Sequence, residues 1–235
     1  METLIIACNT IRNELEKVAE ETKCPYDFVW IESGLHQAPD SLRKRLQEEL
    51  DRTGGANTVL LAFGCCNNAV VGLKTGDYQL IIPRVDDCIT LLLGSIEDRE
   101  RCCRQGGVHF LTKGWLEDES NVWTQYQSVL ANYGKRRTDL VFRNKLAGYK
   151  SLGIIDTGAY DLQGIMPDVT EIAGVLNLEL LVVKGTDDYL RRLLSGPRDD
   201  VNFATIPPGA TIELEHLGLS AKMKGCTAKP GCNSI

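Results

Sequence analysis

The chain has 235 residues, a net charge of −6, 43% hydrophobic and 25% charged residues. These values are typical of globular proteins and argue against disordered, collagen-like and coiled-coil classes. The acidic balance argues against nucleic-acid binding, which needs a basic face. The basic clusters Arg99, Arg101, Arg104 and 135–137 are expected on solvated helix faces or at helix C-termini.

Cysteine usage and the N-terminus indicate the compartment. The longest apolar run is too short for a membrane helix, and the start Met1-Glu2-Thr3 lacks the basic residues of a signal peptide. We therefore expect a cytoplasmic protein with no membrane association. Nine unevenly spaced cysteines then favour metal binding or thiol chemistry over a disulfide framework, and a reducing or anaerobic host would suit them.

Strand-like runs alternate with helical patterns along the chain. A helix is predicted over 10–22, and another after Asp40-Ser41, which we expect to cap it; its Leu42, Leu46 and Leu50 form one buried face. Parallel neighbours need long crossovers, so this alternation predicts an α/β fold with a mainly parallel, doubly wound sheet flanked by helices. The predicted strands are 4–7, 28–31, 59–63, 79–82, 108–111, 151–155 and 178–183, with a possible last strand at 211–215.

The domain organisation follows from the same pattern. Residues 1–220 are expected to form a single α/β domain. Its mainly helical stretch 115–147, broken at Tyr133-Gly134, either caps the sheet or begins a second lobe. Residues 221–235 are rich in Gly and Pro and predict an irregular tail, whose two cysteines match no zinc spacing.

Cysteines follow three of the predicted strands. Cys8 follows the first, the pair Cys65-Cys66 follows 59–63, and Cys88 comes shortly after 79–82. Parallel strands end at one edge of the sheet, where open α/β folds bind ligands, so we expect these thiols to converge. Thiolates suit zinc, copper(I) and iron–sulfur clusters, and three of them leave one position for another ligand. The alternative is that these cysteines only fill apolar space at strand ends.

Carboxylates stand beside the third cysteine. Asp86 and Asp87 precede Cys88, and Arg84 lies two positions further upstream. Arg84 can hold one carboxylate ionised while burial raises the pKa of the other, which suits substrate orientation or proton transfer. The alternative role for Asp87 is to cap the helix that begins near Ile89.

Two further turns are candidate ligand loops. The turn 64–68, which includes Asn68, opens a helix whose N–H groups can bind an anion and lower a thiol pKa. Asp156 and Gly158 follow another strand and are expected to contact a ligand, the alternative being a tight turn made by Gly158. His36, His109 and His216 lack metal-ligand spacing and are expected to be structural or surface residues. No nucleotide-binding motif is present.

These landmarks occur together in an order that resembles a known family. From about residue 3 to residue 217 the chain resembles the bacterial and archaeal domain of unknown function 1638 family. The resemblance implies an anaerobic setting with corrinoid-dependent methyltransferases, and it implies that the family cysteines are Cys8, Cys66 and Cys88. The doubled cysteine leaves open which of Cys65 and Cys66 faces a ligand. The landmarks are Ile6-Ala7-Cys8 with Glu14, the runs 63–68 and 83–89, Leu92-Leu93-Gly94-Ser95, Leu111-Thr112-Lys113-Gly114-Trp115, and 155–161.

Three functions are compatible with these residues. The leading hypothesis is an iron–sulfur or soft-metal protein of corrinoid-linked one-carbon metabolism, with a [4Fe-4S] cluster first and zinc or a corrinoid as alternatives. The second is a metal-free thiol enzyme, racemase- or lyase-like, that acts on a small carboxylate, with Cys8 or Cys66 as base or nucleophile and Arg84 as the carboxylate anchor. Residues 7–10 are similar to the cysteine turn of cofactor-independent aspartate/glutamate racemases. The third is a non-catalytic accessory of a corrinoid protein or methyltransferase.

The leading hypothesis assigns a role to each candidate residue. The expected ligands are a metal and a small molecule. The assigned residues are Cys8, Cys66 and Cys88 as metal ligands, Asp87 and Asp156 as catalytic carboxylates, and Arg84, Asn68 and Gly158 as binding residues.

Overall fold

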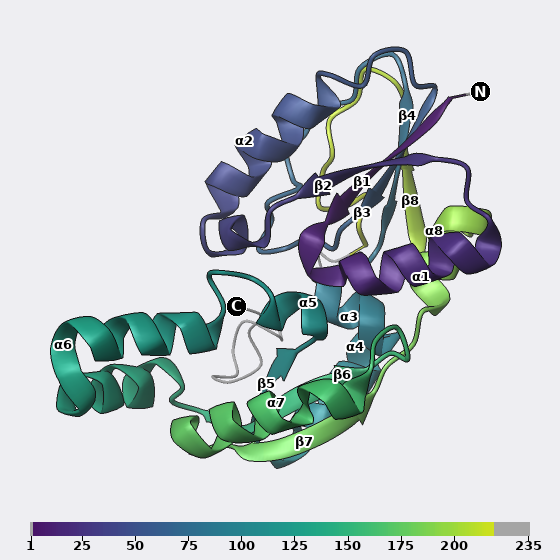
Figure 1. The fold of residues 1–235 in the computed structure, drawn as a ribbon. Helices are drawn as coiled ribbons and strands as arrows, with labels where there is room; N and C mark the ends of the chain where they lie inside the picture. The colour runs from purple at the N-terminus through teal and green to yellow at the C-terminus, as the bar shows by residue number, and fades with distance from the viewer. Residues whose placement is uncertain (1, 219–235) are drawn as a thin grey trace.

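The computed structural model describes residues 2–218 and divides the strands between two sheets (Figure 1). The five-stranded sheet has the order β2-β1-β3-β4-β8, in which only β8 runs antiparallel, and the three-stranded sheet β5-β6-β7 is parallel. The α/β prediction is confirmed, and the strands form two sheets where the sequence suggested one. The strands are β1 (Thr3–Cys8), β2 (Asp27–Ile31), β3 (Thr58–Ala62), β4 (Gln79–Pro83), β5 (Gly107–Leu111), β6 (Tyr149–Asp156), β7 (Glu179–Lys184) and β8 (Phe203–Ile206).

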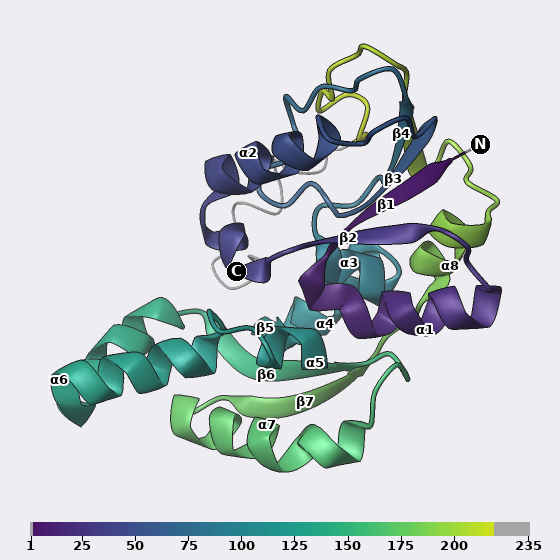
Figure 2. The ribbon, with the colours of Figure 1, turned by 45° about the horizontal axis from the view of Figure 1, so that its top comes forward.

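The first sheet has helices on both faces. Helices α1 (Arg12–Thr22) and α8 (Asp188–Ser195) pack against each other on one face, and α2 (Pro39–Leu50) lies on the other (Figures 1 and 2). The chain goes from β1 outward to β2 and then back past β1 to β3, so the winding direction reverses between β1 and β3. Ligands of open α/β sheets bind at such a reversal, beyond the carboxyl ends of the strands.

The second sheet is inserted between β4 and β8. After β4 the chain forms the short helices α3 (Cys88–Leu93) and α4 (Ile96–Cys102) and the 3-10 turn η3 (Cys103–Gln105) before it enters β5. Helix α7 (Leu162–Leu176) contacts both β6 and β7, and α6 (Val122–Lys145) contacts α7. The chain then returns through α8 to the first sheet. We call this second sheet, with α5, α6 and α7, the second lobe, and the five-stranded sheet with its helices the first lobe. The second sheet begins at β5, before residue 115, where the sequence suggested either a helical cap or a second lobe.

A short helix from the second lobe contacts the first. Helix α5 (Lys113–Leu116) follows β5 and packs on η1 (Asn9–Ile11), the turn that follows β1. A Cβ added to Gly114 would lie 2.3 Å from the Thr10 carbonyl oxygen, and the Thr112 hydroxyl donates to that oxygen at 3.1 Å. Only glycine permits this approach. The carboxyl ends of β1 and β5 therefore face each other across this contact.

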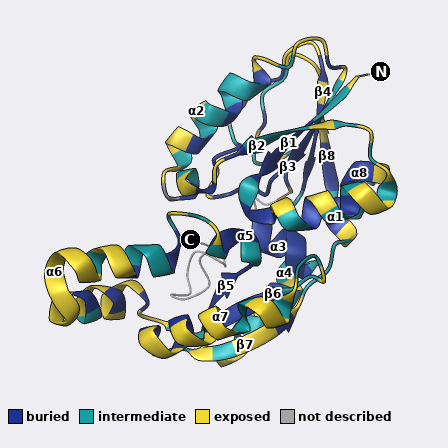
Figure 3. Ribbon diagram, viewed as in Figure 1, coloured by how far each residue is buried: buried dark blue, intermediate teal, exposed yellow. Residues whose placement is uncertain are grey.

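The core lies around the central strands of the first sheet (Figure 3). Strands β1 and β3 are buried on both faces, as expected for parallel strands covered by helices on either side. Leu42, Leu46 and Leu50 form the buried face of α2, as their spacing predicted. The expected kink in α6 is also present, because Gly134 adopts a φ of 73° there.

Two local predictions are wrong. The possible strand at 211–215 is absent, because Thr211 makes only an isolated bridge to Lys74. The last strand within residues 2–218 is β8, which pairs with β4. Its four residues are too few for a clear alternation pattern. Helix α2 begins at Pro39, so its N-cap is Ala38 and the side chains of Asp40 and Ser41 do not cap it. Proline fixes the first helical residue instead.

The expected absence of a membrane helix and the expected C-terminal tail concern different parts of the chain. No helix within residues 2–218 is long and apolar enough to cross a membrane. The irregular tail predicted at 221–235 lies outside the described residues.

A buried histidine makes the stability of the second lobe sensitive to acid. Burial, helped by the charge of Lys145, lowers the pKa of His109 to about 4, whereas an unfolded histidine titrates near 6.5. The unfolded chain therefore binds a proton first, and we expect the free energy of unfolding to fall by roughly 3 kcal/mol between pH 6.5 and 4 on this account. Urea unfolding of His109→Phe across this range should show a flatter dependence than wild type. An unchanged pH slope would contradict this expectation.

Candidate metal centre

Three neighbouring strands bring their cysteines to one edge of the first sheet. Cys8 ends β1, Cys66 follows β3, and Cys88 begins α3 after β4. All three are buried, and the sulfur atoms of Cys66 and Cys88 lie 4.0 Å apart. The structure therefore places these three residues together, at the end of the sheet where its winding direction reverses.

A histidine that the sequence assigned no chemistry completes the site. Cys8, His36 and Cys88 each offer one ligand atom, and these three atoms lie within 4.8 Å of one another. We call this group the Cys/His triad. The Cys8 sulfur is 3.0 Å from His36 Nε2 and 2.8 Å from the Thr10 hydroxyl. The expectation that His36 is merely structural missed this contact, because the histidine comes from the turn η2 (Ser33–Gln37), 28 positions after Cys8.

The backbone between β3 and the next turn sets the position of Cys66. The N–H of Cys65 donates to the Val85 carbonyl at 2.9 Å, and that of Cys66 to the Asp86 carbonyl at 2.7 Å. Gly64 permits this contact, because a Cβ there would lie 2.5 Å from the Asp87 Cα. These bonds join the turn after β3 to the turn after β4, so the positions of Cys66 and Cys88 depend on each other.

The same turn decides which of the paired cysteines faces the site. Cys66, Asn67 and Asn68 have φ values of 46°, 55° and 66°, three consecutive residues in the left-handed region. Asparagine tolerates this conformation, but for cysteine it is strained, and such strain concentrates at functional sites. The turn directs Cys66 toward Cys88, whereas the Cys65 thiol lies 3.4 Å from Asn68 Oδ1. The sequence left this choice open.

The surroundings of Cys8, Cys66 and Cys88 favour the neutral form of these three thiols. Burial, followed by the contact with Cys88, raises the pKa of Cys8 well above its usual value. The hydrogen bond with Cys66 raises the pKa of Cys88 well above its usual value, and burial contributes in the same direction. The hydrogen bond with Cys88 lowers the pKa of Cys66, but burial and the neighbouring acidic groups, chief among them Cys8 and Asp87, outweigh it and raise this pKa. For His36, burial lowers the pKa, but the nearby Cys8 and acidic groups outweigh that effect and raise it.

Arg99 takes the role that the sequence assigned to Arg84. Its Nη1 contacts Asp86 at 2.8 Å and Asp87 at 2.7 Å, and its side chain is only 5% exposed. Burial and the negative charge of Asp87 raise the pKa of Asp86 to about 6, although the positive charge of Arg99 opposes this shift. The alternative of a solvated face is therefore wrong for Arg99, whereas the alternative of a place at a helix C-terminus is confirmed, because Arg99 lies in the last turn of α4. Arg84 instead donates from Nε to the Phe203 carbonyl on β8, at 3.1 Å.

The two predicted catalytic carboxylates occupy different places. Asp87 caps α3, accepting a hydrogen bond from the Thr90 N–H at 2.8 Å, and it also lines the cavity beside Cys88. Asp156 lies at the end of β6 in the second sheet, where one of its oxygens accepts from the Gly158 N–H at 3.2 Å. The neighbouring Thr157 hydroxyl donates to Glu14 at 3.0 Å. Among the described residues, those lining the cysteine cavity do not include Asp156, Gly158, Asn68 or Arg84.

A small cavity adjoins the Cys/His triad. It has a volume of about 20 Å³, and its lining includes His36, Cys66, Asp87, Cys88, Ile89 and Trp115. Helix α5 brings Trp115 here from the second lobe, and its ring centroid lies 5.5 Å from that of His36. A volume near 20 Å³ is enough for one water-sized molecule.

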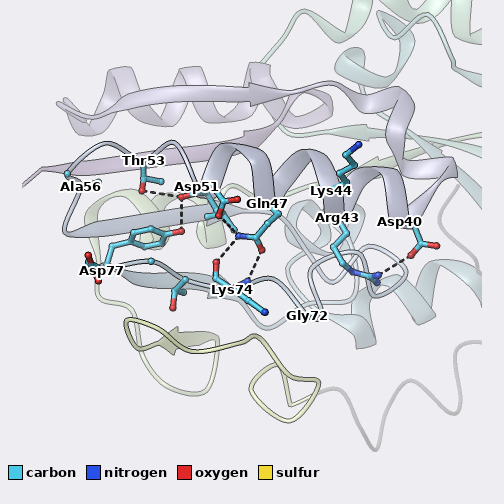
Figure 4. Close-up of a pocket in the computed structure, with 15 residues that line it drawn as sticks. Asp40, Arg43, Lys44, Gln47, Asp51, Thr53, Ala56, Gly72, Lys74 and Asp77 are labelled. Atoms are coloured by element: carbon cyan, nitrogen blue, oxygen red, sulfur yellow. Dashed lines mark hydrogen bonds and ion pairs between the residues drawn. The ribbon is translucent and has the colours of Figure 1, made fainter.

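A larger groove lies elsewhere, along α2. It has a volume of about 840 Å³ and is lined by α2 and the segments 51–56 and 72–78 (Figure 4). Gln47 spans it, bonding Asp51 and both backbone groups of Lys74, and Arg43 pairs with Asp40 (Figure 4). Its charges are mixed in sign, and it shares no lining residue with the cysteine cavity. The chemically distinctive groups therefore lie in the smaller cavity.

Gly64 offers a direct test of how the site is assembled. Gly64→Ala should destabilise the protein by about 1–3 kcal/mol, because the new methyl group would overlap the Asp87 backbone. Gly174→Ala is the control, because this glycine lies in the last turn of α7 and a Cβ added there meets no atom within 4 Å. That variant should be neutral or slightly stabilising. Equal unfolding free energies for the two variants in urea would contradict the close contact.

The fold and the site define an α/β protein with a buried cysteine and histidine group at the carboxyl ends of its parallel strands. The chain belongs to the family described as "Protein of unknown function (DUF1638)", whose model matches residues 30–194. The family resemblance seen in the sequence is thereby confirmed. The matched region contains His36, Cys66 and Cys88, while Cys8 precedes it. No curated protein and no solved structure matches the chain.

Proposed function

We propose that this protein binds a single soft metal ion, such as zinc, through Cys8, His36 and Cys88. The observation that carries the proposal is the convergence of two thiols and an imidazole within 4.8 Å in a buried site. Thiolate and imidazole are the ligands that zinc prefers. Bound there, the ion would supply Lewis acidity at the carboxyl edge of the sheet.

The spacing favours one ion over a cluster. Two sulfur ligands of one zinc ion lie at most about 4.6 Å apart, the sum of two Zn–S bonds, and about 3.8 Å apart in a tetrahedron. The spacing within the triad needs only a small adjustment to fit. Cysteine ligands of a [4Fe-4S] cluster bind different iron atoms and need wider separation. A cavity of about 20 Å³ also offers no room for a corrin ring.

The protonation of the thiols supports a metal site over a metal-free thiol enzyme. A nucleophilic cysteine needs a lowered pKa, whereas burial and neighbouring thiols raise the pKa of Cys8, and contact with Cys66 and burial raise that of Cys88. A bound cation reverses this balance, because a coordinating thiol loses its proton. Two buried thiols of raised pKa beside an imidazole are therefore better suited to a metal than to nucleophilic attack.

The biological setting is proposed from the family resemblance alone. We place the protein in the cytoplasm of an anaerobe, where its metal centre serves corrinoid-linked one-carbon metabolism. It acts there either on a small molecule or as an accessory of a corrinoid protein or methyltransferase. Binding of a corrinoid protein, measured by co-purification from a corrinoid-using anaerobe, separates the second role from the first.

The experiment that tests the proposal is metal and acid-labile sulfide analysis of protein purified without oxygen. We expect about one metal ion per chain and no sulfide. Iron accompanied by stoichiometric sulfide would replace the single ion with a cluster. Protein that holds no metal after anaerobic incubation with zinc, and that has one rapidly alkylated thiol, would favour the thiol-enzyme hypothesis.

A further inference from the structure

Trp115, which lines the cavity beside the Cys/His triad, has an indole N–H without a hydrogen-bond partner among residues 2–218. The residue is 6% exposed, and its Nε1 has no partner among the described residues. A buried N–H without an acceptor costs about 1–3 kcal/mol, so such donors are rare unless a ligand or water satisfies them. Trp115 lines the same cavity as His36 and Cys88, two members of the Cys/His triad.

The triad supplies three ligands, which is one fewer than a closed zinc site has. Structural zinc sites use four protein ligands, while catalytic sites use three and keep the fourth position for an exchangeable ligand. Cys66 is the nearest candidate for a fourth ligand. Its sulfur lies 4.0 Å from that of Cys88, yet it stands outside the group of mutually close ligand atoms.

We propose that the metal held by Cys8, His36 and Cys88 keeps its fourth position open for an exchangeable ligand of one heavy atom, which accepts a hydrogen bond from Trp115 Nε1. The ligand class is water, hydroxide or hydrosulfide, since a cavity of about 20 Å³ admits one water-sized molecule. This inference rests on the proposed metal site. It makes Trp115 a residue that binds the ligand and Cys66 a neighbour that does not coordinate.

Helix α5 explains why this donor comes from the other lobe. It is anchored to η1 by the Thr112 hydroxyl and by the close approach of Gly114 to Thr10, so the indole is fixed relative to Cys8. The ligand position therefore lies where the two lobes meet. Each lobe supplies one part of the site, the metal ligands from the first and the hydrogen-bond donor from the second.

Cobalt(II) substitution tests the inference without requiring a known activity. Visible bands of cobalt report coordination geometry, and the intensity of the sulfur-to-cobalt charge transfer counts thiolate ligands. The cobalt protein is titrated with hydrosulfide, in wild type and in Trp115→Phe and Cys66→Ser. We expect wild type to gain charge-transfer intensity equal to one added sulfur ligand.

The two variants separate the roles of the residues. Trp115→Phe should bind cobalt as wild type does but need about fivefold more hydrosulfide, because one hydrogen bond is lost. Cys66→Ser should keep both the initial charge-transfer intensity and the response to hydrosulfide. If Cys66 were the fourth ligand, that intensity would fall by a third in this variant.

The possible failures are distinguishable. Cobalt that binds but does not respond to hydrosulfide in wild type would show a closed site and overturn the open position, while leaving the metal site intact. Failure of wild type to bind cobalt would overturn the proposed metal site itself. If Trp115→Phe does not fold, the measurements on wild type and Cys66→Ser still decide whether the fourth position is open.

Discussion

Cys88→Ser is expected to weaken zinc binding by about 100-fold or more. Cys88 contributes one of the three ligand atoms of the triad, and even residues that only orient a ligand change metal affinity by about 10–100-fold. A competition titration against a chromophoric chelator, carried out without oxygen, measures the effect. Circular dichroism of the variant checks whether the fold is retained.

Cys65→Ser is the matched control for this variant. Both residues are buried and lie within the same pair of connected turns, but the Cys65 thiol lies beside Asn68 Oδ1 and outside the triad. Its replacement should leave zinc affinity within about threefold of wild type, well below the effect of losing a ligand. Equal zinc affinity in the Cys88 and Cys65 variants would show that Cys88 does not hold the metal.

Arg99→Met is expected to cost about 3–5 kcal/mol of the free energy of unfolding. The substitution leaves Asp86 and Asp87 without the guanidinium that both contact, and breaking a buried ion pair from one side carries this cost. The loss should be larger at pH 8 than at pH 5. Asp86, whose pKa burial raises to about 6, becomes protonated as the pH falls, and the uncompensated charge disappears.

Arg101→Met is the control on the same helix. The Arg101 side chain is 65% exposed and pairs only with Asp98 among the ion pairs of the described residues, so its loss should change stability by less than about 0.5 kcal/mol. Urea unfolding at the two pH values measures both variants. Similar losses for Arg99 and Arg101 would contradict the buried network beneath the site.

The convergence of the cysteines could be predicted from the sequence because it depends only on where each cysteine stands relative to a predicted strand. Each of Cys8, Cys66 and Cys88 follows an apolar run, and parallel strands end at one edge of a sheet. Strand β8 gave a weaker signal, since its four residues are too short to show a pattern.

The rest of the site depends on tertiary structure. His36 reaches Cys8 from a turn 28 positions away, with no ligand spacing to indicate it. Arg99 lies in a short, highly charged helix whose composition is typical of an exposed element, yet the fold buries it against two carboxylates. The choice between Cys65 and Cys66 depends on a left-handed turn that composition does not encode.

The position of Trp115 shows the same limit. Trp115 belongs to the landmarks of the family resemblance, but its place beside the cysteine cavity depends on how α5 of the second lobe contacts η1 of the first. That contact joins two lobes that the sequence did not divide into separate sheets. A single predicted sheet could place cysteines at its edge, but it could not show what faces them.

X-ray absorption at the zinc edge of the zinc-loaded protein tests the central claim most directly. The proposed site predicts two sulfur neighbours at about 2.3 Å, from Cys8 and Cys88, and nitrogen or oxygen neighbours at about 2.0–2.1 Å, from His36 and the exchangeable ligand. A zinc ion surrounded by nitrogen and oxygen alone would contradict the account, because it would place the metal away from the cysteines.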